Sequence, residues 1–339
     1  YAGSNLNSVF GQRSNLLKPG HWKMLRDIVR FNRLAKSTLP DIDDDTSLGA
    51  FLDQYTMGQE FRHHYLYPMA AAIWSCPREQ VSEFPASRFI QFFANHGLLS
   101  INDHPQWYTV KDGSWSYLYA MLEDIGNDAI LNSRVLSVDR RPDGVMVHTR
   151  QNSVRYDEVI FACHSDQALA LLRSPTEQET RALESIPYQS NRVLLHSDPA
   201  LMPRRKRVWS SWNFMGRQQT DASAPPASVT YWMNSLQRLN TSKQYFVSLN
   251  PETEPDPGKV IDELSYDHPV FGTGAVAAQK SIAEMQGQQS TWYCGAWLGY
   301  GFHEDGLKSA ITVARQFGAK IPWQHQPDEK THAVHSHAA

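Results

Sequence analysis

One short segment near the end of the chain is unusually rich in glycine. The seventeen residues of CGAWLGYGFHEDGLKSA, from Cys294 to Ala310, hold four glycines and three aromatic side chains. The residues before them, 291–296, read as a short strand. After Gly306, apolar side chains recur at i, i+3, i+4 and i+7, which predicts an amphipathic helix. The segment therefore predicts a strand, a loop whose backbone can approach a neighbouring group, and a helix that begins at the loop.

The start of this helix is suited to an anion. The first N–H groups of a helix have no acceptor within it, and the helix dipole places positive partial charge there. A phosphate or a polarised carbonyl is one candidate guest, and the alternative is a tight strand-to-helix turn in which Gly306 serves only packing. His303, Glu304 and Asp305 are adjacent, and adjacent side chains seldom converge on one ion. We therefore predict that the acidic pair caps the helix, and we predict no metal site.

Composition narrows the class of protein. The chain has 339 residues, of which 41% are hydrophobic, enough for a large core or for two domains. With 32 Lys+Arg against 35 Asp+Glu, the net charge of -3 argues against a general nucleic-acid binder. The three cysteines, Cys76, Cys163 and Cys294, lie far apart in the sequence and form no C-x-x-C pair, so we expect neither a disulfide scaffold nor a zinc site. We expect the protein to be in a reducing, cytoplasmic setting.

The sequence shows no apolar run of the roughly 20 residues that a membrane-spanning helix needs, and no secretory signal is visible at its start.

The first third of the chain is predicted to be mostly helical and rich in aromatic residues. A first helix over residues 21–39 is expected to carry these side chains at helical spacing: Trp22, Leu25, Ile28, Val29 and Asn32. Ser47 is a candidate N-cap for the next helix. A later helix is expected to turn Phe89, Phe92 and Phe93 inward.

The middle of the chain alternates between strands and helices. We predict a strand over residues 107–110, a turn through Asp112 and Gly113, and a helix from Ser114. A strand over 135–138 leads to a turn at Pro142-Asp143-Gly144 and a returning strand in which Val145, Val147 and Thr149 alternate. Residues 159–163 form an apolar run typical of a strand buried on both faces, and a helix follows from about Ser165. Residues 190–250 read as β-rich, with a surface loop around 222–227, and the polar tail from about Gln324 is predicted to be disordered.

Other chemically suggestive residues have simpler interpretations. His63 and His64 are expected on an ordinary helix surface, and Gly97 is expected to end a helix. His332, His335 and His337 lie in the predicted tail. The aromatic stripe of the β-rich region is either core or the lining of an apolar ligand cavity: Trp209, Trp212, Phe214, Tyr231 and Trp232. No Ser/His/Asp or Cys/His signature supports nucleophilic hydrolysis.

At WYCGAWLGYGFHEDGLKSAITVAR the sequence resembles the last flavin-contacting segment of FAD-dependent oxidoreductases of the amine oxidase/phytoene desaturase superfamily. Further stretches are similar to an amine-oxidase-like, NAD/FAD-binding branch whose members are often encoded beside, or fused to, cyclopropane-fatty-acid synthases: AGSNLNSVFGQRSNLL, YPMAAAIWS, FPASRFIQFFANHGLL, PQWYTVKDGSWSYL, VTYWMNSLQ and DHPVFGTGAVAAQ. The likeness extends to about Trp323. It implies an α/β fold in which a Rossmann-like FAD-binding domain is interleaved with a substrate domain of mixed sheet and helices.

The resemblance also implies a division of the chain. The FAD-binding domain would comprise residues 106–170 and the strand, loop and helix of 291–323. The substrate domain would have a helical part, 1–105, and a β-rich part, 171–290. The tail would be 324–339.

By the same resemblance, several residues would contact the FAD. Gly295 would approach the diphosphate, and the loop would present the helix N-terminus to the flavin through Gly301, Phe302, His303, Glu304 and Gly306. The backbone of Val135 would contact the adenine side, and Ala162, Cys163 and His164 would close over the cofactor. Gly113 and Ser114 match a GGS turn near the flavin, although Asp112 replaces its first glycine.

The function implied is an FAD-dependent oxidoreductase in which the flavin accepts a hydride from an apolar, fatty-acyl or lipid substrate. Amine oxidation is the alternative within the superfamily, and a non-catalytic partner of a lipid-modifying enzyme is the alternative outside it. No catalytic base can be named, and Tyr300 and His303 are the nearest candidates. Peripheral membrane contact is compatible with such a substrate.

One feature of the superfamily is absent from the sequence. Members of the superfamily begin with a strand, a G-x-G-x-x-G loop and a helix. No such glycine pattern occurs in the 339 residues of this sequence. We expect that a segment of roughly 60–90 residues, the size of a βαβ unit with a linker, precedes Tyr1 in the whole protein. The alternative is a relative that has lost the motif and its catalysis.

Overall fold

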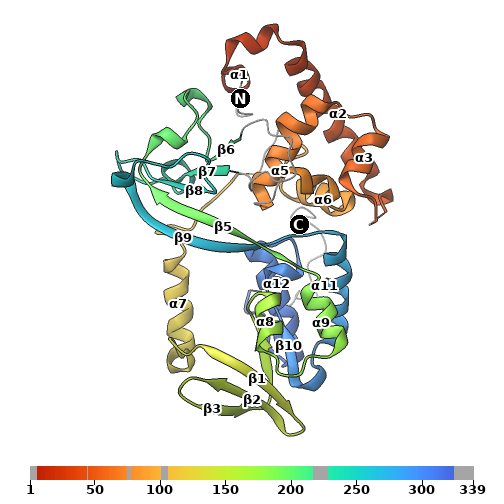
Figure 1. Ribbon diagram of the computed structural model, residues 1–339, viewed down its shortest axis with the longest axis vertical. Helices are drawn as coiled ribbons and strands as arrows, with labels where there is room; N and C mark the ends of the chain where they lie inside the picture. The colour runs from red at the N-terminus through yellow and green to blue at the C-terminus, as the bar shows by residue number, and fades with distance from the viewer. Residues whose placement is uncertain (1–5, 44, 75–77, 101–105, 217–227, 324–339) are drawn as a thin grey trace, which may run out of the picture. The chain divides into compact units, whose positions relative to one another are not determined.

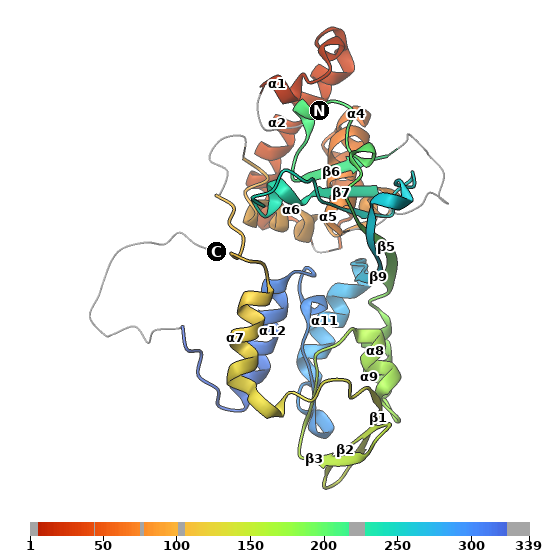
Figure 2. The same cartoon turned by 90° about the vertical axis from the view of Figure 1, so that its left-hand side faces the viewer.

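The computed structural model describes residues 6–43, 45–74, 78–100, 106–216 and 228–323 (Figures 1 and 2). The chain forms two compact units, one from Tyr1–Ala129 and Tyr188–Val270, the other from Ile130–Pro187 and Phe271–Ala339. The expected division differs in its boundaries, because residues 106–129 fall in the first unit and 171–187 and 271–290 in the second. The expectations for Cys76, for the loop around 222–227 and for the His-rich tail lie outside the described residues.

The first unit contains a helical layer with an aromatic core. Phe31 lies 5.3 Å from Phe61, and Phe89 lies 4.3 Å from Phe93, between ring centroids. Phe89, Phe92 and Phe93 are all buried, as predicted. The helices are α1 (Leu6–Val9), η1 (Arg13–Leu17), α2 (Pro19–Thr38), η2 (Leu39–Asp41), α3 (Leu48–Gln54), α4 (Gln59–Phe61), the π-helix η3 (Arg62–Leu66), α5 (Tyr67–Trp74), η4 (Arg78–Glu83), α6 (Ala86–Asn95), α7 (Trp115–Ile125) and η5 (Gly126–Asp128).

Local signals placed several of these helix ends correctly. The Ser47 hydroxyl accepts a hydrogen bond from the backbone N–H of Ala50 and caps α3, as predicted. Gly97 follows α6 with a φ of 68°, a left-handed conformation that suits glycine at a helix end. The predicted turn at Asp112 and Gly113 and the helix that follows them are also present, since Ser114 is the N-cap position of α7.

The helix predicted over residues 21–39 is present as α2, and Asn32 of the predicted side chains is buried, but most of the buried face is formed by other residues. The helix buries Met24, Phe31 and Ala35, whereas Trp22 and Val29 are 50% and 43% exposed. Basic residues such as Arg26 and Arg33 lie on the face that carries Trp22 and Val29. Packing of Phe31 into the aromatic core decides which face is buried.

The first unit also contains a five-stranded antiparallel sheet in the order β6-β7-β8-β5-β9 (Figure 1). The prediction that residues 190–250 are β-rich is confirmed, but β9 was not predicted, and residues 107–110, where a strand was predicted, form none. The aromatic stripe is half-buried, and Trp212 is 41% exposed. The elements are β5 (Tyr188–His196), η6 (Pro199–Leu201), η7 (Lys206–Val208), β6 (Trp212–Met215), β7 (Ser228–Trp232), α10 (Met233–Leu236), β8 (Phe246–Leu249), η8 (Pro257–Lys259) and β9 (Val260–Pro269).

A buried histidine links three strands of this sheet. His196 is fully buried, and its Nε2 lies 2.8 Å from the Ser248 hydroxyl, which in turn lies 2.7 Å from the Thr230 hydroxyl. Its Nδ1 accepts a hydrogen bond from the backbone N–H of Asp198 at 3.1 Å. Because Nδ1 is an acceptor, the ring is neutral with its proton on Nε2. Burial lowers the pKa of His196, and the nearby charge of Asp198 opposes the shift only in part.

This histidine is expected to make folding depend on pH. The pKa of His196 is lower in the folded chain than the ordinary value of 6.5, so below about pH 6.5 the unfolded chain binds the extra proton more readily. Its contribution to stability is therefore complete above that pH and is lost as the pH falls. We expect the urea concentration at the unfolding midpoint to decrease when the pH is lowered from 7.5 to 5.5. In the variant His196→Asn this midpoint is expected to decrease less over the same pH interval. An equal pH dependence in the two proteins would contradict this role.

The second unit combines a small meander with a parallel strand pair flanked by helices. Strands β1, β2 and β3 form an antiparallel sheet, and β4 pairs with β10 in parallel. The predicted turn at Pro142-Asp143-Gly144 joins β1 to β2. The elements are β1 (Val135–Arg141), β2 (Gly144–Thr149), β3 (Ser153–Tyr156), β4 (Val159–Phe161), α8 (Ser165–Leu171), α9 (Glu177–Glu184), α11 (Thr273–Met285), η9 (Gln288–Ser290), β10 (Thr291–Tyr293), η10 (Ala296–Leu298) and α12 (His303–Gln316).

The prediction that residues 159–163 form a strand buried on both faces was only half correct. The strand exists, but Ile160 is 48% exposed while Phe161 is 5% exposed. The run is apolar on both faces because the sequence has no alternation there, and the described part of the second unit covers only the Phe161 face.

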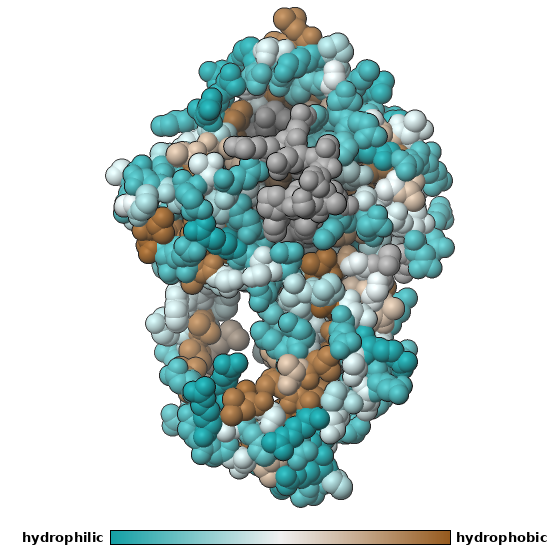
Figure 3. Space-filling model, in the orientation of Figure 1, coloured by the Kyte–Doolittle hydropathy of each residue, from teal (hydrophilic) through white to brown (hydrophobic). Residues whose placement is uncertain are grey.

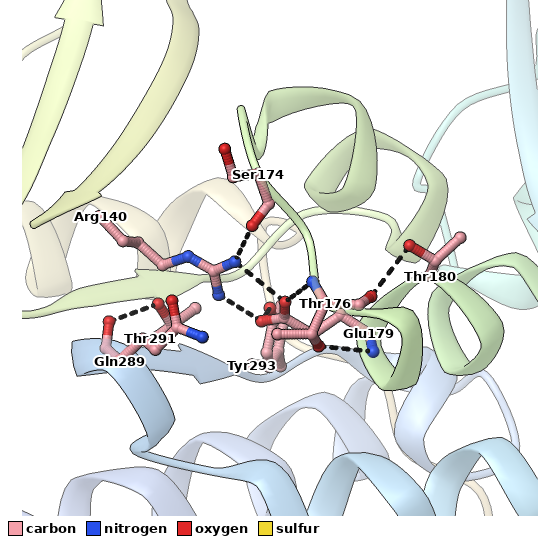
Figure 4. A network of polar contacts seen from close by, with 8 residues as sticks. All are labelled: Arg140, Ser174, Thr176, Glu179, Thr180, Gln289, Thr291 and Tyr293. Carbon is pink, nitrogen blue, oxygen red and sulfur yellow. Dashed lines mark hydrogen bonds and ion pairs between the residues drawn. The ribbon is translucent and has the colours of Figure 1, made fainter.

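A buried ion pair joins three elements of the second unit (Figure 4). Arg140 at the end of β1 makes a bidentate contact with Glu179 of α9, and the two side chains are 5% and 7% exposed. The Tyr293 hydroxyl of β10 donates to Glu179 Oε1 at 2.8 Å, and the backbone N–H of Thr176 donates to Oε2 at 2.7 Å. Burial alone would raise the pKa of Glu179, but the hydrogen bonds from Arg140, Thr176 and Tyr293 outweigh it and lower this pKa. Glu179 therefore holds the meander, α9 and the parallel pair together as a carboxylate.

Candidate functional site

The ends of the two parallel strands bring the glycine loop beside a second turn. Thr291 pairs with Val159 and Tyr293 with Phe161, so β10 and β4 end at the same edge. Each strand is followed by a turn that leads into a helix, α8 after β4 and α12 after β10. In α/β proteins, ligands bind in the crevice outside the carboxyl ends of parallel strands. This edge is therefore the candidate site.

Two hydrogen bonds fix the strand-end turns to each other and to α12. The indole N–H of Trp297 donates to the carbonyl oxygen of Cys163 at 3.0 Å. The Ser309 hydroxyl accepts from the N–H of Gly295 at 2.9 Å, which ties the end of β10 to the second turn of α12. Gly295 has a φ of 156°, and an added Cβ would lie 2.6 Å from Trp297 Nε1. The position therefore requires glycine so that the backbone can pass under the indole.

A glutamine on the neighbouring helix supports the middle of the loop. The side-chain amide of Gln279 in α11 donates to the carbonyl oxygens of Trp297 and Gly299, at 3.0 and 2.8 Å. These bonds satisfy carbonyl groups that a loop of this kind would otherwise leave without partners. The loop is thus a positioned element, although it contains no regular structure beyond η10.

The start of α12 is capped by its own acidic residue. Asp305 Oδ2 accepts a hydrogen bond from the backbone N–H of Phe302 at 3.0 Å, so the predicted capping role is confirmed. Glu304 is exposed and lies 3.6 Å from Lys308, four residues later. The following N–H groups, of His303 and Glu304, have no acceptor inside the helix. Gly301, which precedes them, is exposed with a φ of 92°.

These observations fit the diphosphate and flavin end of a dinucleotide cofactor. An anion can reach the N–H groups at the start of α12, which is fourteen residues long and has a well-developed dipole. Gly301 is exposed and has a positive φ, whereas the N–H of Phe302 is bonded to Asp305 and is not available to a ligand. Gly306 packs against Ala296, where an added Cβ would lie 3.6 Å from the backbone nitrogen. Gly306 thus also has the packing role considered from the sequence.

The structure brings some of the expected cofactor residues together within the second unit. Ala162 and Cys163, which follow β4, lie beside Gly295, and the loop continues to Gly301 and Gly306. Val135 belongs to the same unit but begins β1 in the meander. Gly113 and Ser114 precede α7 in the first unit. The binding roles of all these residues remain predictions.

The candidate acid–base groups of the loop are accessible. Tyr300 is half-buried, and His303 is exposed at the first position of α12. Burial raises the pKa values of the Cys163 and Cys294 thiols, so both are protonated near neutral pH. Across the described ranges, no group of three or more His, Cys, Asp or Glu side chains could hold a metal ion.

Sequence reasoning missed the residues that hold the loop in place. Trp297 lay within the quoted segment, but its partner Cys163 is 134 residues away. Gln279 and Ser309 gave no signal, because a polar residue on a helix is ordinarily solvent-exposed. A strand-loop-helix pattern in the sequence indicates that other residues must hold the loop in its conformation. The pattern does not indicate which side chains form those hydrogen bonds.

Comparisons with known proteins identify the family and the fold. A sequence profile described as flavin containing amine oxidoreductase matches residues 5–238. Among solved structures, the chain is similar to a CLA-producing fatty acid isomerase from P. acnes, with a TM-score of 0.62, 13% identity, and coverage of 88% of this chain and 75% of that one. A variant of putrescine oxidase gives a TM-score of 0.61 and 15% identity, with coverage of 88% and 75%. Cyclohexylamine oxidase from Brevibacterium oxydans gives 0.55 and 11%, with coverage of 87% and 75%.

At these identities the structural likeness shows the fold alone, and it confirms the expected mixed α/β architecture. No curated protein sequence matches the chain.

Proposed function

Because this chain belongs to the flavin-containing amine oxidoreductase family, we propose that it is part of an FAD-dependent oxidoreductase that acts on an apolar, fatty-acyl or lipid substrate. The family name implies a flavin cofactor. The observation that carries the proposal is the edge where β4 and β10 end. There, the turn after Phe161 and the glycine loop meet beside the N-terminus of α12.

In this proposal the chain's own residues bind and orient the cofactor. The N–H groups of His303 and Glu304 would face the diphosphate or the polar end of the flavin, and Gly295 and Gly301 would let the backbone approach it. Trp297 and Gln279 would hold the loop in this conformation through the contacts already described. A bound flavin accepts a hydride from its substrate. Tyr300 and His303 are the candidates for holding or moving a proton near it.

The fatty-acyl assignment draws on the sequence likeness to the branch associated with cyclopropane-fatty-acid synthases. The similar fold of a fatty acid isomerase supports it. Amine oxidation is the second candidate, supported by the family description and by the similar folds of putrescine oxidase and cyclohexylamine oxidase. A lipid-modifying enzyme is the partner that we propose on the same sequence likeness.

An absorbance spectrum tests the cofactor. The protein purified from its complete reading frame is expected to absorb near 450 nm, a generic flavin band of roughly that position, and to release FAD on denaturation. The 339-residue chain alone is expected to retain FAD weakly, because it contains no G-x-G-x-x-G loop. A colourless protein that added FAD cannot reconstitute would support the non-catalytic alternative.

The substrate class is tested on the same band without air. Bleaching by a fatty acid or acyl lipid, but not by putrescine or cyclohexylamine, is the expected result. Bleaching by an amine alone would replace the fatty-acyl proposal by amine oxidation and leave the cofactor assignment intact.

A further inference from the structure

The exposed face of α2 combines basic and apolar side chains. Helical spacing places Trp22, Arg26, Val29 and Arg33 on one side, opposite the buried Phe31. These four side chains are all exposed. Arg26, Val29, Arg30, Arg33, Leu34 and Tyr55 line a surface groove of about 490 Å³ along this face. The exposed face of α2 is therefore amphipathic, because it carries both basic and apolar side chains.

The corner before α2 extends this face with two leucines. Leu17 is 87% exposed and Leu16 is 45% exposed, both at the end of η1. The indole N–H of Trp22 donates to the carbonyl oxygen of Leu16 at 2.9 Å, and the Trp22 ring packs on Phe10 at 5.3 Å between centroids. The corner is thus held in a fixed shape with its leucines outward. In Figure 3, brown side chains protrude at the end of the first unit that Figure 1 draws in red, among teal ones.

A distant segment adds more positive charge beside this corner. Arg204, Arg205, Lys206 and Arg207 are consecutive and exposed, and the last two begin η7. η7 contacts α1, and a Cβ on Gly11 would lie 3.8 Å from Cγ of Arg207. The basic residues of η7 and the start of η1 therefore belong to one region of the first unit.

The two stretches that form this region are strongly basic, although Glu60 of α4 approaches α2 at Gly20, where an added Cβ would lie 3.1 Å from its carboxylate. Residues 6–38 contain seven basic side chains and residues 199–216 contain four, eleven in all, in a protein whose net charge is -3. Asp27 is the only acidic residue in these two ranges, and it is buried, where it accepts from the N–H of Gly58 and contacts Arg26. No other of the eleven pairs with a carboxylate in the part of the chain that the structure describes.

We propose that this surface, formed by η1, the outer face of α2 and η7, docks the protein on an anionic lipid bilayer. Basic side chains near an anionic leaflet are attracted to its surface potential, while Trp and Leu insert at the headgroup boundary. A nucleic acid or an acidic protein would satisfy the charges, but neither accounts for Leu16, Leu17 and Val29 among them. The surface lies on elements of the first unit only, and the inference does not depend on the redox chemistry proposed for the second.

Vesicle sedimentation tests the docking. The full 339-residue chain is expected to sediment with phosphatidylcholine vesicles containing about 30 mol% phosphatidylserine, to stay in solution with phosphatidylcholine alone, and to release as salt increases. The triple variant Lys23→Glu/Arg33→Glu/Arg205→Glu is expected to bind about 100-fold more weakly. Leu17→Ser is expected to weaken binding several-fold without changing its salt dependence.

Matched variants elsewhere separate docking from general charge and folding effects. Arg150→Glu/Lys280→Glu/Lys320→Glu makes the same change in net charge from exposed positions of the second unit, and it is expected to bind at least about tenfold more tightly than the first triple variant. Leu131→Ser, where the side chain is 76% exposed, is the control for Leu17→Ser. Thermal melts show that each variant is folded.

Equal loss in both triple variants, equal binding to neutral and anionic vesicles, or no binding to vesicles would each overturn the proposal. Binding to heparin or RNA but not to vesicles would assign the cations to a polyanion instead and would also overturn it.

Discussion

Replacing Glu179 with alanine is expected to lower the free energy of unfolding of the second unit by about 3–5 kcal/mol, the usual cost of removing one partner of a buried ion pair. The variant leaves the guanidinium of Arg140 nearly buried without its carboxylate, and it leaves the Tyr293 hydroxyl without its acceptor. It also removes the cap contact to the N–H of Thr176. One substitution is thus expected to weaken the attachment of β1, α9 and β10 to one another, since Glu179 makes all of these contacts (Figure 4).

Hydrogen exchange measured by mass spectrometry locates the effect. Peptides covering β1, α9 and β10 are expected to exchange faster in Glu179→Ala, while those of α2 and α6 in the first unit do not. Glu177→Ala changes an exposed glutamate in the first turn of the same helix and is the matched control, with an expected loss below about 1 kcal/mol. Glu179→Gln, which retains an acceptor for Tyr293, is expected to fall between the two. Similar stability of the Glu177 and Glu179 variants would show that the ion pair contributes nothing.

The same contact gives the second unit an acid limit. The pKa of Glu179 is lower in the folded chain than its ordinary value of 4.5, so its contribution is complete above about that pH and is lost as the pH falls through the lowered value. This window lies below the one for His196. The two units are therefore expected to lose stability over different pH ranges.

Replacing Gly299 with alanine is expected to disrupt the start of α12. A Cβ at this position would lie 2.4 Å from Asp305 Oδ1 and 2.6 Å from Asp305 Cβ, so rotation of the carboxylate alone cannot relieve the contact. Asp305 then has to withdraw from the N–H of Phe302. Loss of the cap costs about 1 kcal/mol, and overpacking adds about 1–3 kcal/mol.

Two measurements follow this variant. Exchange at the first turn of α12 is expected to accelerate whether or not a cofactor binds. If the loop holds FAD as proposed, the FAD dissociation constant is also expected to rise at least about tenfold. Gly274→Ala in α11, where the nearest atom to the new Cβ is 3.9 Å away, is the control and is expected to be neutral or stabilising by up to about 1 kcal/mol. Unchanged exchange in Gly299→Ala would mean that the loop accommodates a side chain and that its geometry is less constrained than the contacts indicate.

Local chemistry was readable from the sequence. The Ser47 cap, the Gly97 helix end and the Pro142-Asp143-Gly144 turn depend on interactions within three or four residues, and each was predicted correctly. The strand-loop-helix unit around Gly295 was identified in the same way, although α12 begins at His303 and not after Gly306. The strand predicted for 107–110 was wrong, because its residues have no partner strand in the described chain.

Features that depend on packing were not readable. The choice between the two faces of α2 depends on Phe31 entering a core formed by helices later in the chain, and the helical spacing of Trp22 and Val29 did not identify the buried face. Strand β9 was missed because its sequence lacks the alternation of apolar and polar residues that is typical of a half-buried strand. Only its pairing with β5 identifies this segment as a strand.

The sequence by itself determined the kind of fold, the family likeness and the strand, loop and helix at the candidate site, since these follow from periodicity, glycine and capping residues that act over a few positions. Only the tertiary structure decided which side chains hold that site. The contacts of Trp297 with Cys163, of Gln279 with the loop, and of Glu179 with Arg140 and Tyr293 join residues that are far apart in the chain. Such contacts form once strand register and helix packing are set, and a single sequence carries no local signal for them.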